Sequence, residues 1–393
     1  MARNAALRQF LAAASSLRLT VALLVLSMFL IFAATLDQVH IGVWGVQGKY
    51  FHSFFIWTKA PIGNFNLPIF PGGYLLGAVL IVNLVAAHFS RFKLSASKAG
   101  IWIIHLGLIL LLVGEGISGM MQRDAQMRID VGGTATYAES TRHVELAVID
   151  ATARDHDDVV SIPDSLLSGL GTVQDPRLPF TVRVLSYFPN ATIRVRGLGP
   201  MEGPNPATTG AGTGLALMPL PPTRKDDEAD APACYVELRG ADGPLGAWLV
   251  STRLVEAQEL SFQGRRWLLS LRPARDYLPF SITLLKFTHD VYPGTEIPKN
   301  FASRVRLRGG AGRDDREVRI FMNNPLRYGG RAFYQAGCDN NDRTTILQVV
   351  SNPGWQLPYL CCAMIALGLV VQFGRHLFRF LRGPRANPGA PAP

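Results

Sequence analysis

The sequence predicts a membrane protein with four transmembrane helices and an extracytoplasmic all-β domain that is sandwich-like or barrel-like. Three observations support this prediction. Four apolar runs are each about 20 residues long, the length that a helix needs to cross about 30 Å of hydrocarbon. The long segment between the third and fourth runs consists of short alternating stretches that are typical of antiparallel strands. Basic residues gather on one side of the four runs, as the positive-inside rule requires.

The four predicted spans cover about residues 17–36, 72–89, 99–119 and 357–380. The first three form an N-terminal membrane region over residues 1–119. Residues 37–71, between the first and second spans, are rich in aromatic side chains, which favour the headgroup region of a bilayer. We therefore expect a surface loop or a short interfacial helix there. The tail 381–393 contains RANPGAPAP and is predicted to be a disordered cytoplasmic segment.

The distribution of cations sets the predicted orientation. They flank the runs at Arg3, Arg8 and Arg18, at Arg91, Lys93 and Lys98, and at Arg375, Arg379, Arg382 and Arg385. If these flanks are cytoplasmic, the chain is a multi-pass protein of the inner (plasma) membrane, with residues 120–356 on the periplasmic side. The same distribution accounts for the formal net charge of +10, so no nucleic-acid partner is predicted.

Residues 120–356 are predicted to form the β-rich domain. Alternating apolar stretches such as 144–149, 180–185 and 282–287 are separated by clusters of Gly, Pro, Asn and Asp, and no long amphipathic helical pattern is present. Within the domain, residues 196–232 are rich in Gly and Pro and are predicted to be a disordered insertion. The sequence gives no role for this insertion.

Two histidines occupy positions inside the predicted spans. His105 lies about six residues into the third span, and His88 lies near the end of the second. Ionisable groups inside a membrane are costly and often functional, and neutral imidazole is a common ligand of haem iron. The alternative is that each ring only donates a hydrogen bond to a backbone carbonyl or sits at the interface. Both interpretations stay open at this point.

Motifs of self-contained enzymes are absent from the sequence. It contains no Walker A loop, dinucleotide-binding glycine pattern, HExxH, GxSxG, CxxC or CxxCH. We therefore predict no complete catalytic centre in this chain alone. Cys234 and Cys338 fall in the predicted exterior domain, where a disulfide is chemically allowed, but the sequence does not show whether they pair.

Several motifs near the C-terminal end resemble a known family. The runs LPFSITLLKFTHDVYPGTEIPKNFASRVRL (278–307) and FMNNPLRYGGRAFYQAG (321–337) resemble the ResB family, also called CcsB, of cytochrome c biogenesis proteins (System II). The run TTILQVVSNPGWQLPYL then precedes the last span. A Tyr-Pro-Gly turn, an Asn-Pro-Leu-Arg-Tyr segment, a Phe-Tyr-Gln strand and an Asn-Pro-Gly turn occur in the family's order. The four-span topology matches as well.

The resemblance implies a function and partners. A ResB-like subunit pairs with a ResC/CcsA-type membrane protein, and together they carry haem across the bilayer and support its attachment to apocytochrome c. A histidine in the third span of the family helps to hold haem in transit, and His105 matches that place. His88 is the second candidate haem-binding residue, and His105 is the candidate ligand of the haem iron. Because this chain has no Trp-rich haem-handling loop, the resemblance implies one component of a cytochrome c synthase complex and not a catalyst on its own. A thioredoxin-like thiol reductant is a further candidate partner.

Two other classes of function compete with this one. In the first, the chain is a scaffold that stabilises the ResC-like partner without contacting haem. In the second, it is a membrane receptor or sensor with a β-domain, which the intramembrane histidines and the motif order disfavour. The sequence does not identify the cytochrome served, the redox state of haem in transit or the stoichiometry with the partner.

Overall fold

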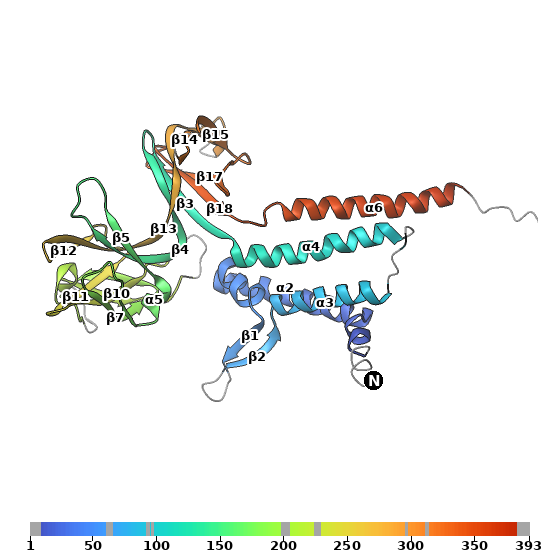
Figure 1. Ribbon diagram of the computed structural model, residues 1–393, viewed down its shortest axis with the longest axis horizontal. Coiled ribbons are helices and arrows are strands. Elements are labelled where there is room, and N and C mark those ends of the chain that lie inside the picture. Colours follow the sequence, from blue (N-terminus) through green and yellow to red (C-terminus); the bar gives the residue numbers. More distant parts are fainter. Residues whose placement is uncertain are drawn as a thin grey trace, which may run out of the picture. The chain divides into compact units, whose positions relative to one another are not determined.

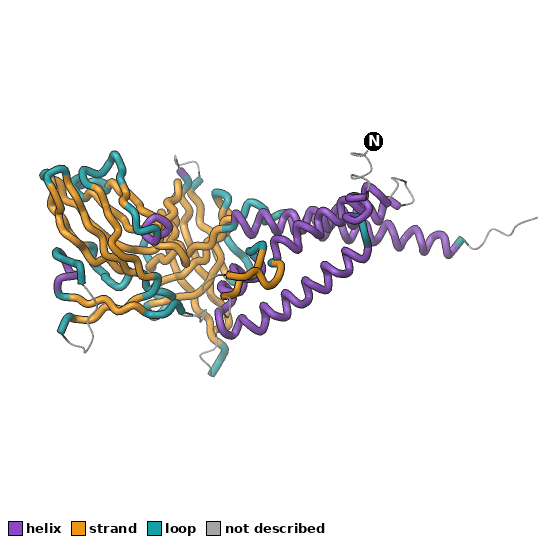
Figure 2. Tube along the Cα trace, turned by 90° about the horizontal axis from the view of Figure 1, so that it is seen from below, coloured by secondary structure: helices purple, strands orange, loops and turns teal. Residues whose placement is uncertain are grey.

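The computed structural model describes residues 9–59, 66–91, 95, 98–197, 205–223, 229–294, 298–310 and 314–382. They fall into two compact units (Figures 1 and 2). The helical unit contains the described residues up to Gln122 and from Asn352 onward. The sheet-rich unit contains Arg123–Thr223 and the described part of Asp227–Ser351. The cations Arg3, Arg8, Lys93 and Arg385 and the tail from residue 383 onward lie outside the described residues.

The helical unit has four helices that are long and apolar enough to cross a membrane, which confirms the four predicted apolar segments. They are α2 (Leu17–Val46), α3 (Gly73–Arg91), α4 (Ala99–Met121) and α6 (Leu357–Leu381). By their length and composition, these four helices are candidate membrane spans.

The first long helix extends further than predicted. Residues 37–41 contain no Gly or Pro, so α2 continues past residue 36 until Gly42, which has a non-helical φ of 70°. A π-helical turn, η1 (Gln47–Phe51), follows. The predicted surface segment 37–71 then ends in a small hairpin of β1 (Phe55–Lys59) and β2 (Asn66–Pro71).

Glycines at a spacing of seven residues set the packing of α4 against α6. Gly100, Gly107 and Gly114 are all buried on one side of α4. A Cβ at Gly107 would lie 2.9 Å from Cγ1 of Ile365, and one at Gly114 would lie 3.1 Å from Leu357. Small residues let membrane helices approach closely, so this stripe allows α4 and α6 to pack backbone against backbone.

The sheet-rich unit is built on one long antiparallel sheet. Its strands, in spatial order, are β15 (Asp315–Phe321), β14 (Pro298–Arg308), β13 (Arg265–Val291), β4 (Thr134–Asp150), β3 (Arg123–Asp130), β18 (Thr344–Ser351), β17 (Arg331–Asp339) and β16 (Leu326–Tyr328). Two further strands pair with its long members, β12 (Gln258–Phe262) with β13 and β5 (Asp158–Pro163) with β4.

A smaller sheet accompanies the long one. It contains β11 (Gly243–Ser251), β10 (Ala233–Gly240), β7 (Thr181–Phe188) and β6 (Thr172–Val173). The remaining elements are the hairpin of β8 (Ala191–Val195) and β9 (Leu215–Pro219), the short helix α5 (Asp164–Ser168) and the 3-10 turn η3 (Gly210–Thr213).

The strands enclose two hydrophobic cores. The first core lies between the smaller sheet and the part of the long sheet formed by β5, the end of β4 and the start of β13, and its members include Leu146, Val182, Val236, Trp267 and Leu269. The second core gathers side chains from the start of β4, the end of β13 and the strands on either side of them in the long sheet, including Met127, Ile282, Leu307, Phe333 and Leu347. The strands β4 and β13 contribute to both cores. The prediction of a large sheet-rich domain before the last span is confirmed.

Part of the segment that we predicted to be disordered (196–232) is folded. The stretch 215–219 forms β9, and Leu217 is buried with Tyr235 and Leu249. The Asn205 side chain donates hydrogen bonds to the carbonyls of Gly212 and Leu215. Composition suggested disorder, but the alternating apolar residues of β9 pair with β8 and bury their side chains. Residues 198–204 and 224–228 lie outside the described part of the chain.

Candidate functional site

The structure brings the two predicted histidines into contact. His88 is on α3 and His105 is on α4, and their ring centroids are 4.6 Å apart with an interplanar angle of 60°. Only a short connection separates Arg91 from Ala99, so α3 and α4 are neighbouring antiparallel helices. Residues that lie a few positions before and after such a connection reach a similar depth in the helix pair.

Each imidazole is held by the backbone of its own helix. His88 Nδ1 is 3.2 Å from the Leu84 carbonyl oxygen, and His105 Nδ1 is 2.8 Å from the Ile101 carbonyl oxygen. A ring that donates its Nδ1–H to a carbonyl carries its lone pair on Nε2. Neutral imidazole binds iron through such a lone pair, and a hydrogen bond on the other nitrogen fixes the tautomer and the ring orientation.

The two histidines differ in accessibility. His88 is 3% exposed, and its ring also contacts Trp102 edge-on with centroids 4.6 Å apart. His105 is only partly buried. A bulky planar ligand can therefore reach His105 more readily than His88.

The distance between the rings limits what the pair can bind. Axial ligands of a haem iron bind from opposite faces of the porphyrin, so the macrocycle lies between them. Rings with centroids 4.6 Å apart are in direct van der Waals contact. In this arrangement His88 and His105 cannot both ligate one haem iron.

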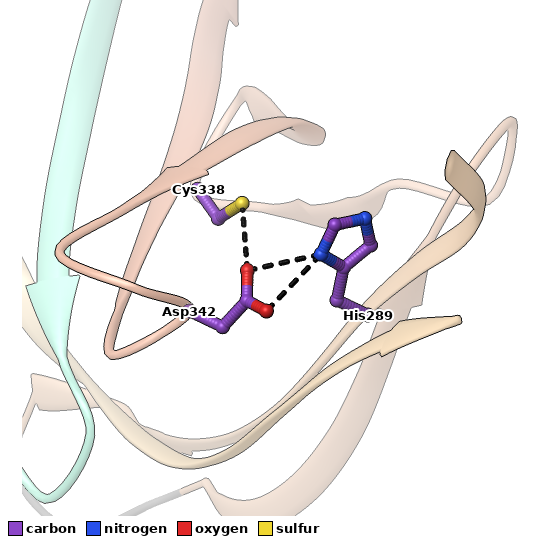
Figure 3. Close-up of side chains that lie close together, drawn as sticks. All are labelled: His289, Cys338 and Asp342. Carbon is purple, nitrogen blue, oxygen red and sulfur yellow. Dashed lines mark hydrogen bonds and ion pairs between the residues drawn. The ribbon is translucent and has the colours of Figure 1, made fainter. Parts of the chain in front are cut away.

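A second group of side chains, which the sequence analysis did not single out, lies in the sheet-rich unit. His289, Cys338 and Asp342 offer ligand atoms that all lie within 4.8 Å of one another (Figure 3). Burial, with the Asp342 carboxylate beside it, raises the pKa of the Cys338 thiol to about 11. The hydrogen bonds from Cys338 and His289 lower the pKa of Asp342. Because the first member is 49 positions before the second, no sequence spacing shows the group.

The structure contains all four cysteines as free thiols. Cys234 is fully buried in the first core, and this burial raises the pKa of its thiol to about 12. Cys338 instead donates a hydrogen bond to Asp342. The pairing that the sequence left open is therefore not present in this structure.

These features define a protein with four helices of membrane-spanning length, in which two histidines are in contact between adjacent apolar helices and a sheet-rich domain separates the third apolar helix from the last. Residues 257–346 match the model of the ResB-like family. This ResB-like segment runs from β12 into β18. The resemblance stated from the sequence motifs is thereby confirmed.

A curated relative matches part of the chain. Protein NrfI of Wolinella succinogenes is 38% identical to this chain over 102 residues, which are 26% of this chain and 11% of NrfI. The chain thus spans about a tenth of the length of the curated relative that it matches.

Proposed function

We propose that this chain acts in cytochrome c biogenesis, as the ResB-like subunit of a complex that moves haem across the membrane and supports its attachment to apocytochrome c. The ResB-like segment, the similarity to protein NrfI and the four apolar helices support this role. Haem is the cargo of the complex in this proposal, not a resident cofactor.

The contact between His88 and His105 is the observation that carries the proposal. Polar side chains are expensive within apolar helices, and two imidazoles in mutual contact on adjacent helices indicate a functional site. His105 is the iron ligand in this proposal, because it is the more accessible ring and its Nδ1 is anchored to Ile101. His88 is a positioning residue that packs against the ligand ring.

The second axial ligand comes from the ResC/CcsA-type partner. The ring contact supports this assignment, because it leaves no space for a porphyrin between the two histidines of this chain. The complex then holds haem between subunits, so that removal of either ligand weakens binding.

The sheet-rich unit faces the extracytoplasmic side and positions apocytochrome c, or stabilises the partner there. Each thioether forms when a cysteine S–H adds across a haem vinyl group, with the sulfur and the hydrogen going to the two vinyl carbons. Holding haem and apocytochrome together makes this encounter effectively unimolecular. A thioredoxin-like reductant keeps the apocytochrome cysteines as thiols.

The test is co-purification of the chain with its partner in detergent, with haem measured by absorbance. His105→Ala is expected to lower the haem content per complex by roughly tenfold. Exogenous imidazole, which supplies the missing ligand, is expected to restore it. His143→Ala is the matched control, since this exposed histidine pairs with Asp164 in the sheet-rich unit.

Two outcomes would decide against the proposal. An undiminished haem content in His105→Ala would remove His105 as the ligand. If, in addition, the partner accumulated normally with His105→Ala and was lost only when the whole chain was missing, the scaffold function would replace haem handling.

A further inference from the structure

The sheet-rich unit places an imidazole, a thiol and a carboxylate around one point. His289 is near the end of β13, Cys338 is near the end of β17, and Asp342 is in the turn between β17 and β18 (Figure 3). His289 Nδ1 is 3.0 Å and 3.1 Å from the two carboxylate oxygens of Asp342. The Cys338 Sγ is 3.1 Å from Asp342 Oδ1.

We propose that His289, Cys338 and Asp342 form a binding site for a divalent transition-metal ion, with Zn²⁺ as the first candidate. Nitrogen, thiolate sulfur and carboxylate oxygen are the three ligand types that Zn²⁺ takes in proteins. The thiolate disfavours the hard cations Mg²⁺ and Ca²⁺, which take oxygen ligands. The site goes beyond the function proposed above, because it involves neither haem nor the histidines of the helical unit.

The hydrogen bonds of the group mark where the cation fits. The Cys338 thiol and the His289 ring both donate hydrogen bonds to Asp342, so protons hold the three side chains together. A divalent cation takes over this role when the thiol loses its proton and the ring proton of His289 moves from Nδ1 to Nε2, which frees the lone pair of Nδ1 for the cation. Tetrahedral zinc, with bonds of about 2.0–2.3 Å, separates its ligand atoms by about 3.3–3.6 Å. The contacts to Asp342 therefore need to lengthen by only a few tenths of an ångström.

The surrounding structure holds the ligands in place. The His289 ring stacks on Phe301 of β14 with centroids 4.5 Å apart, and these two residues are paired in the strand register. Cys338 is paired in register with Thr345 of β18. Asn340, Asn341 and Asp342 all have positive φ values, of 52°, 53° and 64°, so the turn that presents the Asp342 carboxylate is tightly constrained.

The His289 ring faces the Asp342 carboxylate through only one of its two nitrogens, Nδ1. The other ring nitrogen of His289, Nε2, is buried and has no hydrogen-bond partner among the described residues. The His289 side chain is only 19% exposed, so most of the ring is covered by the surrounding strands.

The group is open on one side. Half of the Asp342 side chain is exposed, at 49%, so solvent has access to the carboxylate. Three protein ligands and an open fourth position are the pattern of zinc sites that bind water or an incoming ligand, whereas closed structural sites have four protein ligands. The fourth ligand is therefore water or a donor atom of a molecule that docks on this turn.

Cobalt substitution on the full chain in detergent tests the site. Co²⁺ is a spectroscopic substitute for Zn²⁺, and cobalt–thiolate bonding gives a near-ultraviolet charge-transfer band. We expect one Co²⁺ per chain with this band, and its displacement by Zn²⁺. Cys338→Ser keeps a hydrogen-bond donor beside Asp342 but is expected to abolish the band and to weaken binding by roughly a hundredfold. Asp342→Asn is expected to weaken binding while the band remains at saturation.

Cys362→Ser is the matched control, because it removes an exposed thiol of α6 and should leave the band unchanged. Circular dichroism of each variant shows whether the sheet-rich unit is folded. Absence of the band in the folded wild-type chain, or its persistence in folded Cys338→Ser, would overturn the site and leave only a hydrogen-bonded turn. Neither result would affect the haem measurement on His105→Ala.

Discussion

Gly100 of α4 and Gly368 of α6 bring two helix backbones into direct contact. A Cβ placed on Gly100 would lie 2.8 Å from the carbonyl oxygen of Gly368, and a Cβ placed on Gly368 would lie 2.8 Å from the carbonyl oxygen of Gly100. Real Cβ atoms do not approach backbone atoms so closely, and helix backbones cannot yield as a flexible side chain does. This contact therefore joins the third and fourth apolar helices, which precede and follow the sheet-rich unit in the sequence.

We expect Gly368→Leu to destabilise the helical unit. The side chain would force α4 and α6 apart, which for overpacked cores costs about 1–3 kcal/mol. The measurement is the thermal unfolding midpoint in detergent. Gly374→Ala on the same helix is the control, since nothing lies within 4 Å of its Cβ position. Equal midpoints for Gly368→Leu and the control would contradict the close packing of the two helices.

A buried ion pair in the sheet-rich unit gives a second prediction. Arg272 Nε donates to Glu145 Oε1 at 2.9 Å, and the two side chains are only 13% and 6% exposed. Removal of one partner leaves an uncompensated buried charge, so Glu145→Leu should lower the free energy of unfolding by about 3 kcal/mol. The double replacement of Glu145 and Arg272 by Leu should restore part of this loss. Denaturant titration followed by the fluorescence of the buried Trp267 measures both changes.

The exposed pair of Arg306 and Asp315 serves as the comparison for this prediction. Its side chains are 42% and 40% exposed, and pairs of this kind contribute about 0–1 kcal/mol. Asp315→Leu should therefore change the free energy of unfolding by less than Glu145→Leu. The reverse order would show that burial does not determine the contribution of these pairs.

The sequence allowed the architecture to be predicted because apolar length and strand alternation are local signals. The predicted first span ends at residue 36, yet α2 continues to Val46, since only Gly42 interrupts the helical backbone. The division of the β-domain into two cores was not predictable, because it depends on how β4 and β13 pair along their whole lengths. The disorder expected at 196–232 was inferred from composition, which does not show that Leu217 has a buried site on the smaller sheet.

The two candidate sites also differ in whether the sequence allowed them to be predicted. His88 and His105 were found because a histidine is conspicuous in an apolar run, and a short connection brings neighbouring helices together. His289, Cys338 and Asp342 belong to strands and a turn that are distant in sequence. A method that reads spacing along the chain cannot detect a group that exists only through strand register.

The histidine pair yields a prediction that separates ligand from positioning residue. We expect His88→Phe to retain most of the haem in the co-purified complex, because an aromatic ring still packs against Trp102 and His105. His105→Phe should lose the haem, since phenylalanine has no lone pair for the iron. The measurement is the haem absorbance of the two complexes, compared at equal amounts of protein. Loss of haem in His88→Phe with retention in His105→Phe would exchange the two assignments.

Metal binding at His289, Cys338 and Asp342 should depend on pH in a predictable direction. Burial and the neighbouring Asp342 carboxylate raise the pKa of the Cys338 thiol to about 11, so at neutral pH the metal-free thiol carries its proton. Because the thiolate is the ligand, one proton leaves when the metal binds, and the apparent affinity should rise about tenfold per pH unit between pH 7 and 9. Titration with Co²⁺ at several pH values, followed by the charge-transfer band, measures this slope. In Cys338→Ser the band should be absent at every pH. A wild-type affinity that is independent of pH over this range would mean that the thiol does not give up a proton to the metal.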